Sequence, residues 1–203
     1  TPRGRKLVFL APTKASPRRG PKRNMPLPME PTAIRDALTN PDPAIALAVS
    51  LIAFHALTTQ QVQHVQLTDI IDGRLRMPDG RSIPLAKPVR VRLTAWLDHR
   101  AKRWPETKNP YLLVTIQTAP RLSPPSRNFP WRKAGVTAQA LRTDRILYEV
   151  EQTGGDVRRV CDLFGIGIET ALRYSATILE PPTPGERAPT HTGEIDNESA
   201  STV

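Results

Sequence analysis

Two side chains that can do phosphate chemistry stand 32 residues apart in the second half of the chain, Arg142 and Tyr174. A guanidinium presents a rigid fork of N–H donors that matches the oxygens of a phosphate. A phenol hydroxyl is a hydrogen-bonding group and, in some enzymes, a nucleophile. An isolated tyrosine near a helix end more often packs its ring on the core and leaves its hydroxyl exposed to solvent. The surrounding pattern must therefore decide between these interpretations.

The elements that carry this pair are predicted to be consecutive helices. Thr137 is a suitable N-cap for a helix over 137–151, which the two glycines at 154–155 end. Asp156 caps a helix over 157–164, and a last helix covers about 169–175. Arg142 and Tyr174 thus belong to neighbouring helices.

The first half of the chain predicts more helices. A short helix over 31–38 begins with proline, and a strongly apolar helix over 44–57 is expected to be buried. Thr58-Thr-Gln-Gln61 has the form of a capping box and opens a helix through Val65.

A hairpin follows, with strands over 74–77 and 81–85 around Pro78-Asp-Gly80. Pro84 confines the second strand to a sheet edge. A helix over 89–104 is expected to bury a face that includes Val91, Leu93, Leu97 and Trp104, and the Pro-rich residues 105–131 are expected to form loops. The expected fold class is mainly α with a small β-hairpin or sheet.

Composition divides the chain into three parts. Residues 1–24 hold eight Lys or Arg and no acid, which predicts a basic flexible arm. Residues 181–203 hold four acids and one arginine and predict an acidic disordered tail, which leaves 25–180 as the folded domain. A net charge of +10 favours a polyanionic partner, although such charge also serves solubility.

The sequence gives little support for a disulfide-bonded, a metal-binding or a membrane protein. The single cysteine, Cys161, cannot form an internal disulfide, and the four histidines have no zinc-site spacing, so neither a metal nor a cofactor is expected. The apolar run at 44–57 is too short to cross a bilayer, and no signal peptide is visible. We expect no membrane partner and a cytoplasmic, nucleoid-associated location.

The motif order resembles the catalytic domain of the tyrosine recombinases, or phage integrases, over roughly 30–178. That family carries His-x-Leu-Arg, a Gly-Asp helix start, Leu-Gly-His, and a tyrosine about 30 residues after the arginine. This chain has Gln139-Ala-Leu-Arg142, Gly155-Asp156, Leu163-Phe-Gly165-Ile166 and Tyr174. Its hairpin strand Arg81-Ser-Ile-Pro-Leu85 is similar to the family's Arg-x-x-Pro-Leu.

The resemblance assigns roles to residues and also exposes replacements. Tyr174 matches the nucleophile that attacks a DNA phosphodiester, and Arg142 matches one of two phosphate-clamping arginines. Arg76 stands for the hairpin lysine and is a poor general acid. Gln139 stands for a histidine and cannot move a proton near neutral pH.

At two further positions this chain lacks the charged or proton-transferring residue that the family carries. Thr58 stands where the first clamping arginine belongs, and Ile166 replaces a second histidine. For DNA contacts without cleavage we expect a set of basic side chains on the hairpin and before the Arg142 helix: Arg74, Arg81, Arg132 and Lys133.

The resemblance therefore implies a domain that binds double-stranded DNA in recombination or integration, with impaired or lost strand cleavage. It also implies possible homo-oligomers on DNA. Two alternatives stay open: an active, divergent integrase that uses Tyr174 as nucleophile, and a basic helical interaction protein without recombinase function.

Overall fold

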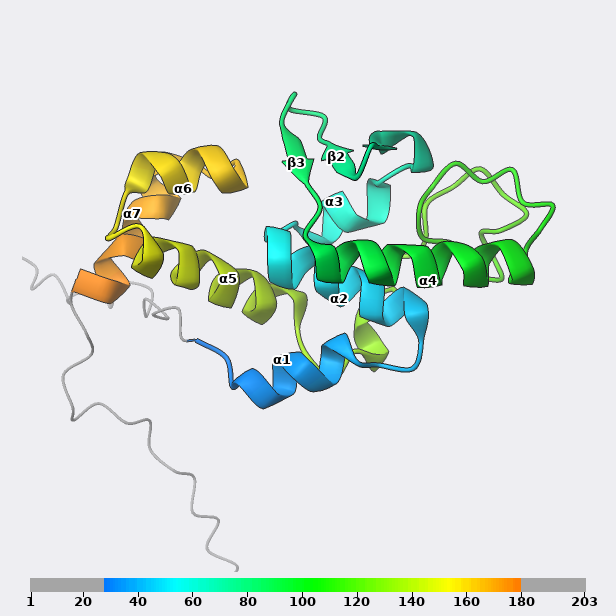
Figure 1. Cartoon of the computed structure of the whole chain (residues 1–203), viewed down its shortest axis with the longest axis horizontal. Helices are drawn as coiled ribbons and strands as arrows, with labels where there is room; N and C mark the ends of the chain where they lie inside the picture. The colour runs from blue at the N-terminus through cyan, green and yellow to red at the C-terminus, as the bar shows by residue number, and fades with distance from the viewer. Residues whose placement is uncertain (1–27, 180–203) are drawn as a thin grey trace, which may run out of the picture.

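The computed structural model describes residues 28–179, and both the basic arm at 1–24 and the acidic tail at 181–203 lie outside them. The described part is mainly helical with one small sheet, as the sequence predicts (Figure 1). Its helices are α1 (Pro31–Leu38), α2 (Pro43–His55), α3 (Thr59–His64), α4 (Lys87–Arg103), α5 (Ala138–Gln152), α6 (Val157–Phe164) and α7 (Ile168–Leu179). The remaining elements are β1 (Ile70–Ile71), β2 (Arg74–Arg76), β3 (Ser82–Pro84) and two 3₁₀ turns, η1 (Leu67–Asp69) and η2 (Trp131–Lys133).

Helix α2 is the centre of the molecule. All residues from 44 to 52 are buried, and the helix packs against α1, α4 and α5. It begins where the sequence allows it to: Pro43 needs no N–H partner in the first turn, and Asp42 accepts a hydrogen bond from the backbone N–H of Ala44 at 2.9 Å. It ends at Ala56, which adopts the left-handed conformation.

Helix α4 corrects one detail of the sequence prediction. Its buried face consists of Val89, Leu93 and Trp96, whereas Val91 is 62% exposed. The spacing of four and then three residues is that of one helical face, and Val91 falls off it. The Trp96 indole also donates a hydrogen bond to the backbone oxygen of Leu112 at 2.8 Å, which ties α4 to the following loop.

The hairpin forms as predicted, with β2 and β3 antiparallel and Leu75 opposite Ile83. Gly80 in its turn has a φ of +85°. Because the strand order is β1-β2-β3, Pro84 does lie on an edge strand. Strand β1 was not predicted, since two residues are too few to give a periodic signal.

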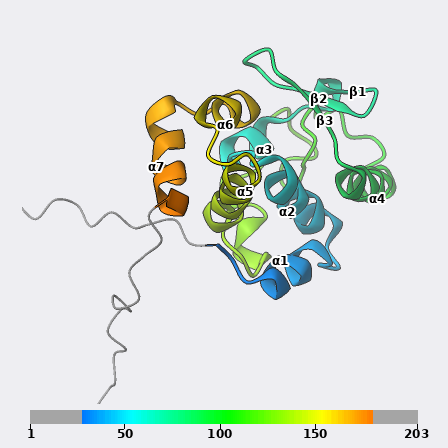
Figure 2. The ribbon, with the colours of Figure 1, turned by 60° about the vertical axis from the view of Figure 1, so that its left-hand side comes forward.

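The segment from α5 to α7 forms the C-terminal end of the described residues and has its own hydrophobic cluster. Thr137 and Asp156 cap α5 and α6, with hydrogen bonds of 3.1 and 3.0 Å, and so confirm both predictions. Helix α7 is longer than the predicted 169–175. Figures 1 and 2 place α6 and α7 beside α5, away from most of α4.

A second cluster of buried side chains unites these three helices with the end of α2: Ala56, Ile146, Leu147, Val150, Val160, Phe164, Ala171 and Tyr174. The larger cluster lies around α2 and α4 and reaches the start of α5 through Ala138 and Leu141. Helix α5 therefore belongs to both clusters. Within residues 28–179, no helix has the length and apolar character needed to cross a membrane.

Candidate functional site

Helices α5 and α7 pack against each other and bring the Arg142 and Tyr174 segments together. Tyr174 is only 8% exposed, and its ring belongs to the second cluster. Its hydroxyl lies 3.5 Å from Oγ1 of Thr143, which is also buried. Thr143 follows Arg142 directly, so one turn of α5 supplies both neighbours of the phenol. No motif in the sequence pointed to Thr143 as a neighbour of the phenol.

Arg142 is half-buried, and its Nη1 donates a hydrogen bond to the backbone oxygen of Ala56. Burial lowers the pKa of Arg142, the nearby Tyr174 opposes that shift, and the guanidinium of Arg81 adds to it. Arginine remains charged at any ordinary pH. Three groups from α5, α7 and the hairpin therefore lie within electrostatic reach of one another.

Arg81 reaches this region from the turn of the hairpin. Its Nη2 forms an ion pair with Asp79 at 2.7 Å, and its Nη1 donates to the backbone oxygen of Leu163 at 2.8 Å. The guanidinium rests on Gly165, where an added Cβ would lie 2.5 Å from Nη2. Because Gly165 ends α6 with a φ of +60°, this glycine satisfies both the left-handed backbone and the close approach.

The three replaced family positions have ordinary structural surroundings. Thr58 caps α3: its hydroxyl accepts from the Gln61 N–H at 3.1 Å, and the Gln61 side chain accepts from the Thr58 N–H at 2.8 Å. Ile166 packs against the second cluster. Gln139 is exposed, and its amide lies 3.4 Å from Oγ1 of Thr143.

The two hairpin arginines on β2 share one outward face. Arg74 and Arg76 are exposed while Leu75 between them is buried, as strand alternation requires. The Arg74 guanidinium is held against β3 by Ser82, with hydrogen bonds of 2.9 and 3.0 Å to its hydroxyl and backbone oxygen. Arg76 is free to extend into solvent on the same face.

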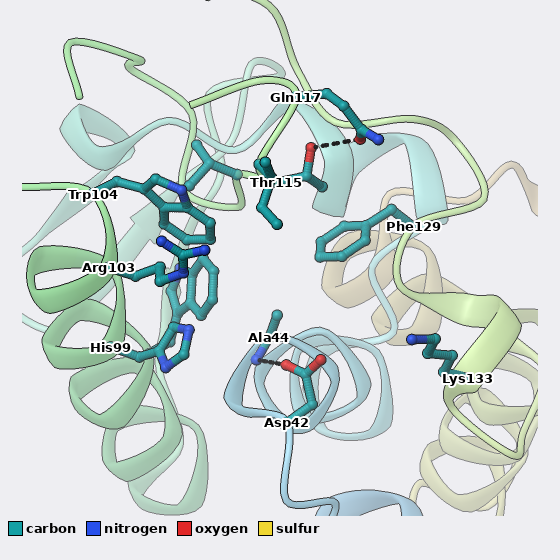
Figure 3. A pocket seen from close by; sticks show the side chains of 12 residues that line it. Asp42, Ala44, His99, Arg103, Trp104, Thr115, Gln117, Phe129 and Lys133 are labelled. Carbon is teal, nitrogen blue, oxygen red and sulfur yellow. Dashed lines mark hydrogen bonds between the residues drawn. The ribbon is translucent and has the colours of Figure 1, made fainter. Parts of the chain in front are cut away.

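Arg132 and Lys133 lie elsewhere. Both are exposed residues of η2, a segment on the side of α2 that faces α1, while β2 and β3 lie on its opposite side (Figures 1 and 2). Lys133 lines a cavity of about 450 Å³ whose walls include Trp104 and Phe129 (Figure 3). The structure therefore does not bring these two cations to Tyr174 or to the hairpin.

His55, at the end of α2, is a titratable group outside the set of predicted site residues. Burial lowers the pKa of His55 to about 4, and the guanidinium of Arg145 adds to the shift. Its Nε2 accepts from the Ala86 N–H at 3.3 Å, so the ring is neutral. Within residues 28–179 no group of three or more His, Cys, Asp or Glu residues is arranged to hold a metal ion.

Comparisons with solved structures identify the fold. The chain superposes on the crystal structure of XerA recombinase with a TM-score of 0.60 at 20% identity, over 74% of this chain and 60% of the other. Two XerH site-specific recombinase structures, bound to a difH substrate before cleavage and to a palindromic difH substrate after cleavage, each give a TM-score of 0.56.

The identities to the XerH chains are 16% and 15%, over 77% of this chain. The chain spans only 53% and 51% of their length. No protein-family model matches the sequence, and no curated protein matches it either. The helical order, the three-stranded sheet and these superpositions establish that residues 28–179 have the fold of a tyrosine recombinase catalytic domain.

Proposed function

We propose that this chain is a DNA-binding domain that acts in DNA recombination or integration and whose strand-cleaving chemistry is impaired or lost. The fold supports the first part, since the similar XerH structures are complexes with a difH substrate. The composition supports it too, because a net charge of +10 suits double-stranded DNA.

The basic side chains around the hairpin make the proposed contact surface. Arg74 and Arg76 extend from the outer face of β2, Arg81 reaches the end of α6, and Arg142 lies on α5. Arginines at such positions bind backbone phosphates, which fix orientation without reading sequence.

One observation carries the proposal of lost cleavage: Thr58 is fully engaged as a helix cap and offers no cation. Phosphoryl transfer from DNA places negative charge on the non-bridging oxygens, and removing one electrostatic partner at such sites costs about 10²–10³ in rate. Gln139 and Ile166 cannot transfer a proton, and Arg76 is too basic to do so. The phenol of Tyr174 therefore has a phosphate-binding arginine, Arg142, nearby. It has no residue that can transfer a proton at the positions where the tyrosine recombinases carry one.

DNA binding is tested by fluorescence anisotropy with a labelled duplex between about 50 and 200 mM salt. We expect log affinity to fall steeply and linearly with log salt. Arg74→Ala with Arg76→Ala should weaken binding and reduce the slope by about two phosphates. The exposed loop pair Arg121→Ala with Arg127→Ala is the matched control. No binding at low salt would favour the basic interaction protein instead.

An active, divergent integrase is the second candidate, favoured by the position of the Tyr174 hydroxyl, which lies 3.5 Å from Oγ1 of Thr143, the residue after Arg142 on α5. A nicked suicide duplex distinguishes it, because an active enzyme accumulates a covalent DNA–protein adduct. We expect no adduct with the wild-type chain. An adduct that disappears in Tyr174→Phe would establish cleavage and refute the inactive form.

Assembly on DNA is tested in the same preparation. If the domain forms homo-oligomers on its substrate, sedimentation of the complex will give more than one protein copy per short duplex. A single copy at saturating protein would contradict that part of the proposal.

A further inference from the structure

A cavity of about 450 Å³ lies between the end of α4, the loop that follows it and η2 (Figure 3). Its volume is in the range of pockets that bind small molecules. The start of α2, with Asp42 and Ala44, forms one side of it. None of the lining residues belongs to the hairpin, α5, α6 or α7, so this cavity is separate from the region around Arg142 and Tyr174.

Aromatic rings form two opposite walls of the cavity. Trp104 and His99 lie on one side, and Phe129 lies on the other (Figure 3). The first wall is held from behind by Trp96, which is buried: His99 stacks on its ring with a centroid distance of 5.6 Å, and the Trp104 ring lies 6.3 Å from it. A flat ring between aromatic walls gains stacking on its faces.

Two cations line the same cavity from opposite sides, Arg103 and Lys133 (Figure 3). The Arg103 guanidinium lies over the Trp104 ring, 5.7 Å from its centroid. The ion pairs among residues 28–179 include neither cation. The carboxylate in the lining is Asp42, whose Oδ1 accepts from the Ala44 N–H at 2.9 Å. The lining therefore offers two charges for an anion and one acceptor for a donor group.

Buried hydrogen bonds fix the loop that supplies another side of the cavity. Asn109 is 2% exposed, and its Nδ2 donates to the backbone oxygens of Thr118 and Ser123 at 2.7 and 2.9 Å. Its Oδ1 accepts from the Tyr111 N–H at 2.9 Å. Long loops without regular structure are uncommon in compact domains and usually serve a function. The lining residues 114–117 are thus held in place by the loop itself.

We propose that this cavity binds a nucleoside monophosphate, with the base between Trp104 and Phe129 and the phosphate on Arg103 and Lys133. A flat ring, an anion and hydrogen-bond donors occur together in such a molecule and match the lining. Asp42 accepts from a ribose hydroxyl or a base N–H. This site is independent of the proposed duplex contact, because the two share no residue.

Titration calorimetry with AMP, adenosine and ribose 5-phosphate tests the site. Adenosine lacks the phosphate, and ribose 5-phosphate lacks the base. We expect saturable binding of one AMP per chain, at least about tenfold tighter than either fragment, because the charged hydrogen bonds and the stacking each contribute about that factor. Absence of AMP binding would refute the proposal. Equal affinities for AMP and ribose 5-phosphate would also refute it, since they would show only attraction of an anion to a basic protein.

The two cations have matched controls beside them in the sequence. Arg103→Ala and Lys133→Ala should each weaken AMP binding about tenfold and leave adenosine binding unchanged. Lys102→Ala and Arg132→Ala remove the same charge at exposed residues that do not line the cavity, and they should keep the wild-type affinity for AMP. Equal losses in the test and control variants would mean that no particular cation holds the phosphate, and the proposal would be wrong.

Phe129→Leu keeps an apolar side chain but removes the ring face. It should weaken the binding of AMP and adenosine about tenfold and leave ribose 5-phosphate binding unchanged. Phe129 also packs against the larger hydrophobic cluster, so thermal unfolding of this variant is measured first. If it does not fold, the exposed Lys133 and its control carry the test.

NMR locates the ligand directly. The indole N–H signal of Trp104, assigned by its loss in Trp104→Phe, should shift as AMP is added. The indole N–H of Trp96 should move less, because it is buried and donates to the Leu112 oxygen. An unmoved Trp104 signal at saturating AMP would place the nucleotide elsewhere and overturn the assignment of this cavity.

Discussion

Three arginines near the junction of the two hydrophobic clusters donate hydrogen bonds to backbone carbonyls. Arg142 donates to Ala56 and Arg145 donates to Phe54, both at the end of α2, and Arg81 donates to Leu163 at the end of α6. The last carbonyls of a helix have no partner within it, so cations there satisfy them and oppose the negative end of the helix dipole. These arginines therefore have a structural use beside any ligand they bind.

His55 should make the stability of the fold depend on pH. Above pH 6.5 the His55 ring is neutral in both the folded and the unfolded chain, so the free energy of unfolding does not depend on its titration there. Between pH 6.5 and about 4 the unfolded chain binds a proton that the folded chain excludes. The free energy of unfolding should therefore fall by about 2 to 3 kcal/mol as the pH drops through this window.

The measurement is urea unfolding at a series of pH values. His55→Gln keeps a group that can accept from the Ala86 N–H but cannot titrate, so it should flatten the profile between pH 6.5 and 4. His64→Gln, at an exposed histidine, is the control. The free energy of unfolding of this variant should depend on pH as it does in the wild-type chain. A wild-type profile with no slope in this window contradicts the argument.

At the scale of elements, α5 is the connection on which the site depends. Arg142 and Arg145 both leave α5 toward the end of α2, and Thr143 turns toward α7. Arg145 also forms an ion pair with Glu149 at 2.9 Å and lies over the rings of Tyr148 and Phe164. The position of Arg142 relative to Tyr174 is set by this packing rather than by any loop.

We predict that Arg145→Met lowers the free energy of unfolding by about 2 to 3 kcal/mol. The methionine fills similar space, but Glu149, whose side chain is only 12% exposed, loses its nearest cation, and the Phe54 carbonyl loses a donor. Arg159→Ala is the comparison. Arg159 also reaches Glu149, at 3.6 Å, but is 61% exposed, so its removal should cost about 0.5 kcal/mol or less.

Chemical denaturation of both variants measures these two values. Equal losses in Arg145→Met and Arg159→Ala would show that the salt bridge is a surface pair and that α5 is held by apolar packing alone.

At the scale of the whole molecule, the described residues 28–179 contain two hydrophobic clusters of unequal size. The larger surrounds α2 and α4, and the smaller joins α6 and α7 to the last turns of α5. Local opening follows such units, because a region with fewer buried contacts unfolds at a lower free-energy cost. Tyr174 belongs to the smaller cluster, whereas Leu75 of the hairpin belongs to the larger one.

Native-state hydrogen exchange should therefore find the amides of α6 and α7 opening at a lower free energy than those of α2. Phe164→Ala, at a position 6% exposed, should speed exchange in α6 and α7 and leave α2 unchanged. Leu51→Ala, within α2, should speed exchange in all helices. Equal protection throughout the wild-type chain would mean that the domain opens as one unit.

The amino-acid sequence by itself determined the local features. Pro43, the capping box at Thr58, the turn at Gly80 and the cap at Asp156 all act within four residues of themselves, so their effects can be read in order along the chain. The motifs around Arg142 and Tyr174 resemble those of the tyrosine recombinases, and this resemblance implied the fold. The predicted face of α4 was wrong at Val91, because the apolar residues Val89, Val91 and Leu93 alternate with arginines, and so short a stretch fits more than one helical face.

Only the tertiary structure decided which side chains meet. In the folded chain Arg81 contacts the end of α6, Thr143 lies beside Tyr174, and Lys133 lines a separate cavity. The Arg81–Leu163 contact joins residues 82 positions apart, and all these contacts depend on how whole helices and the hairpin pack. Helix crossing angles follow from the fit of many side chains at once, so no local pattern in the chain contains them.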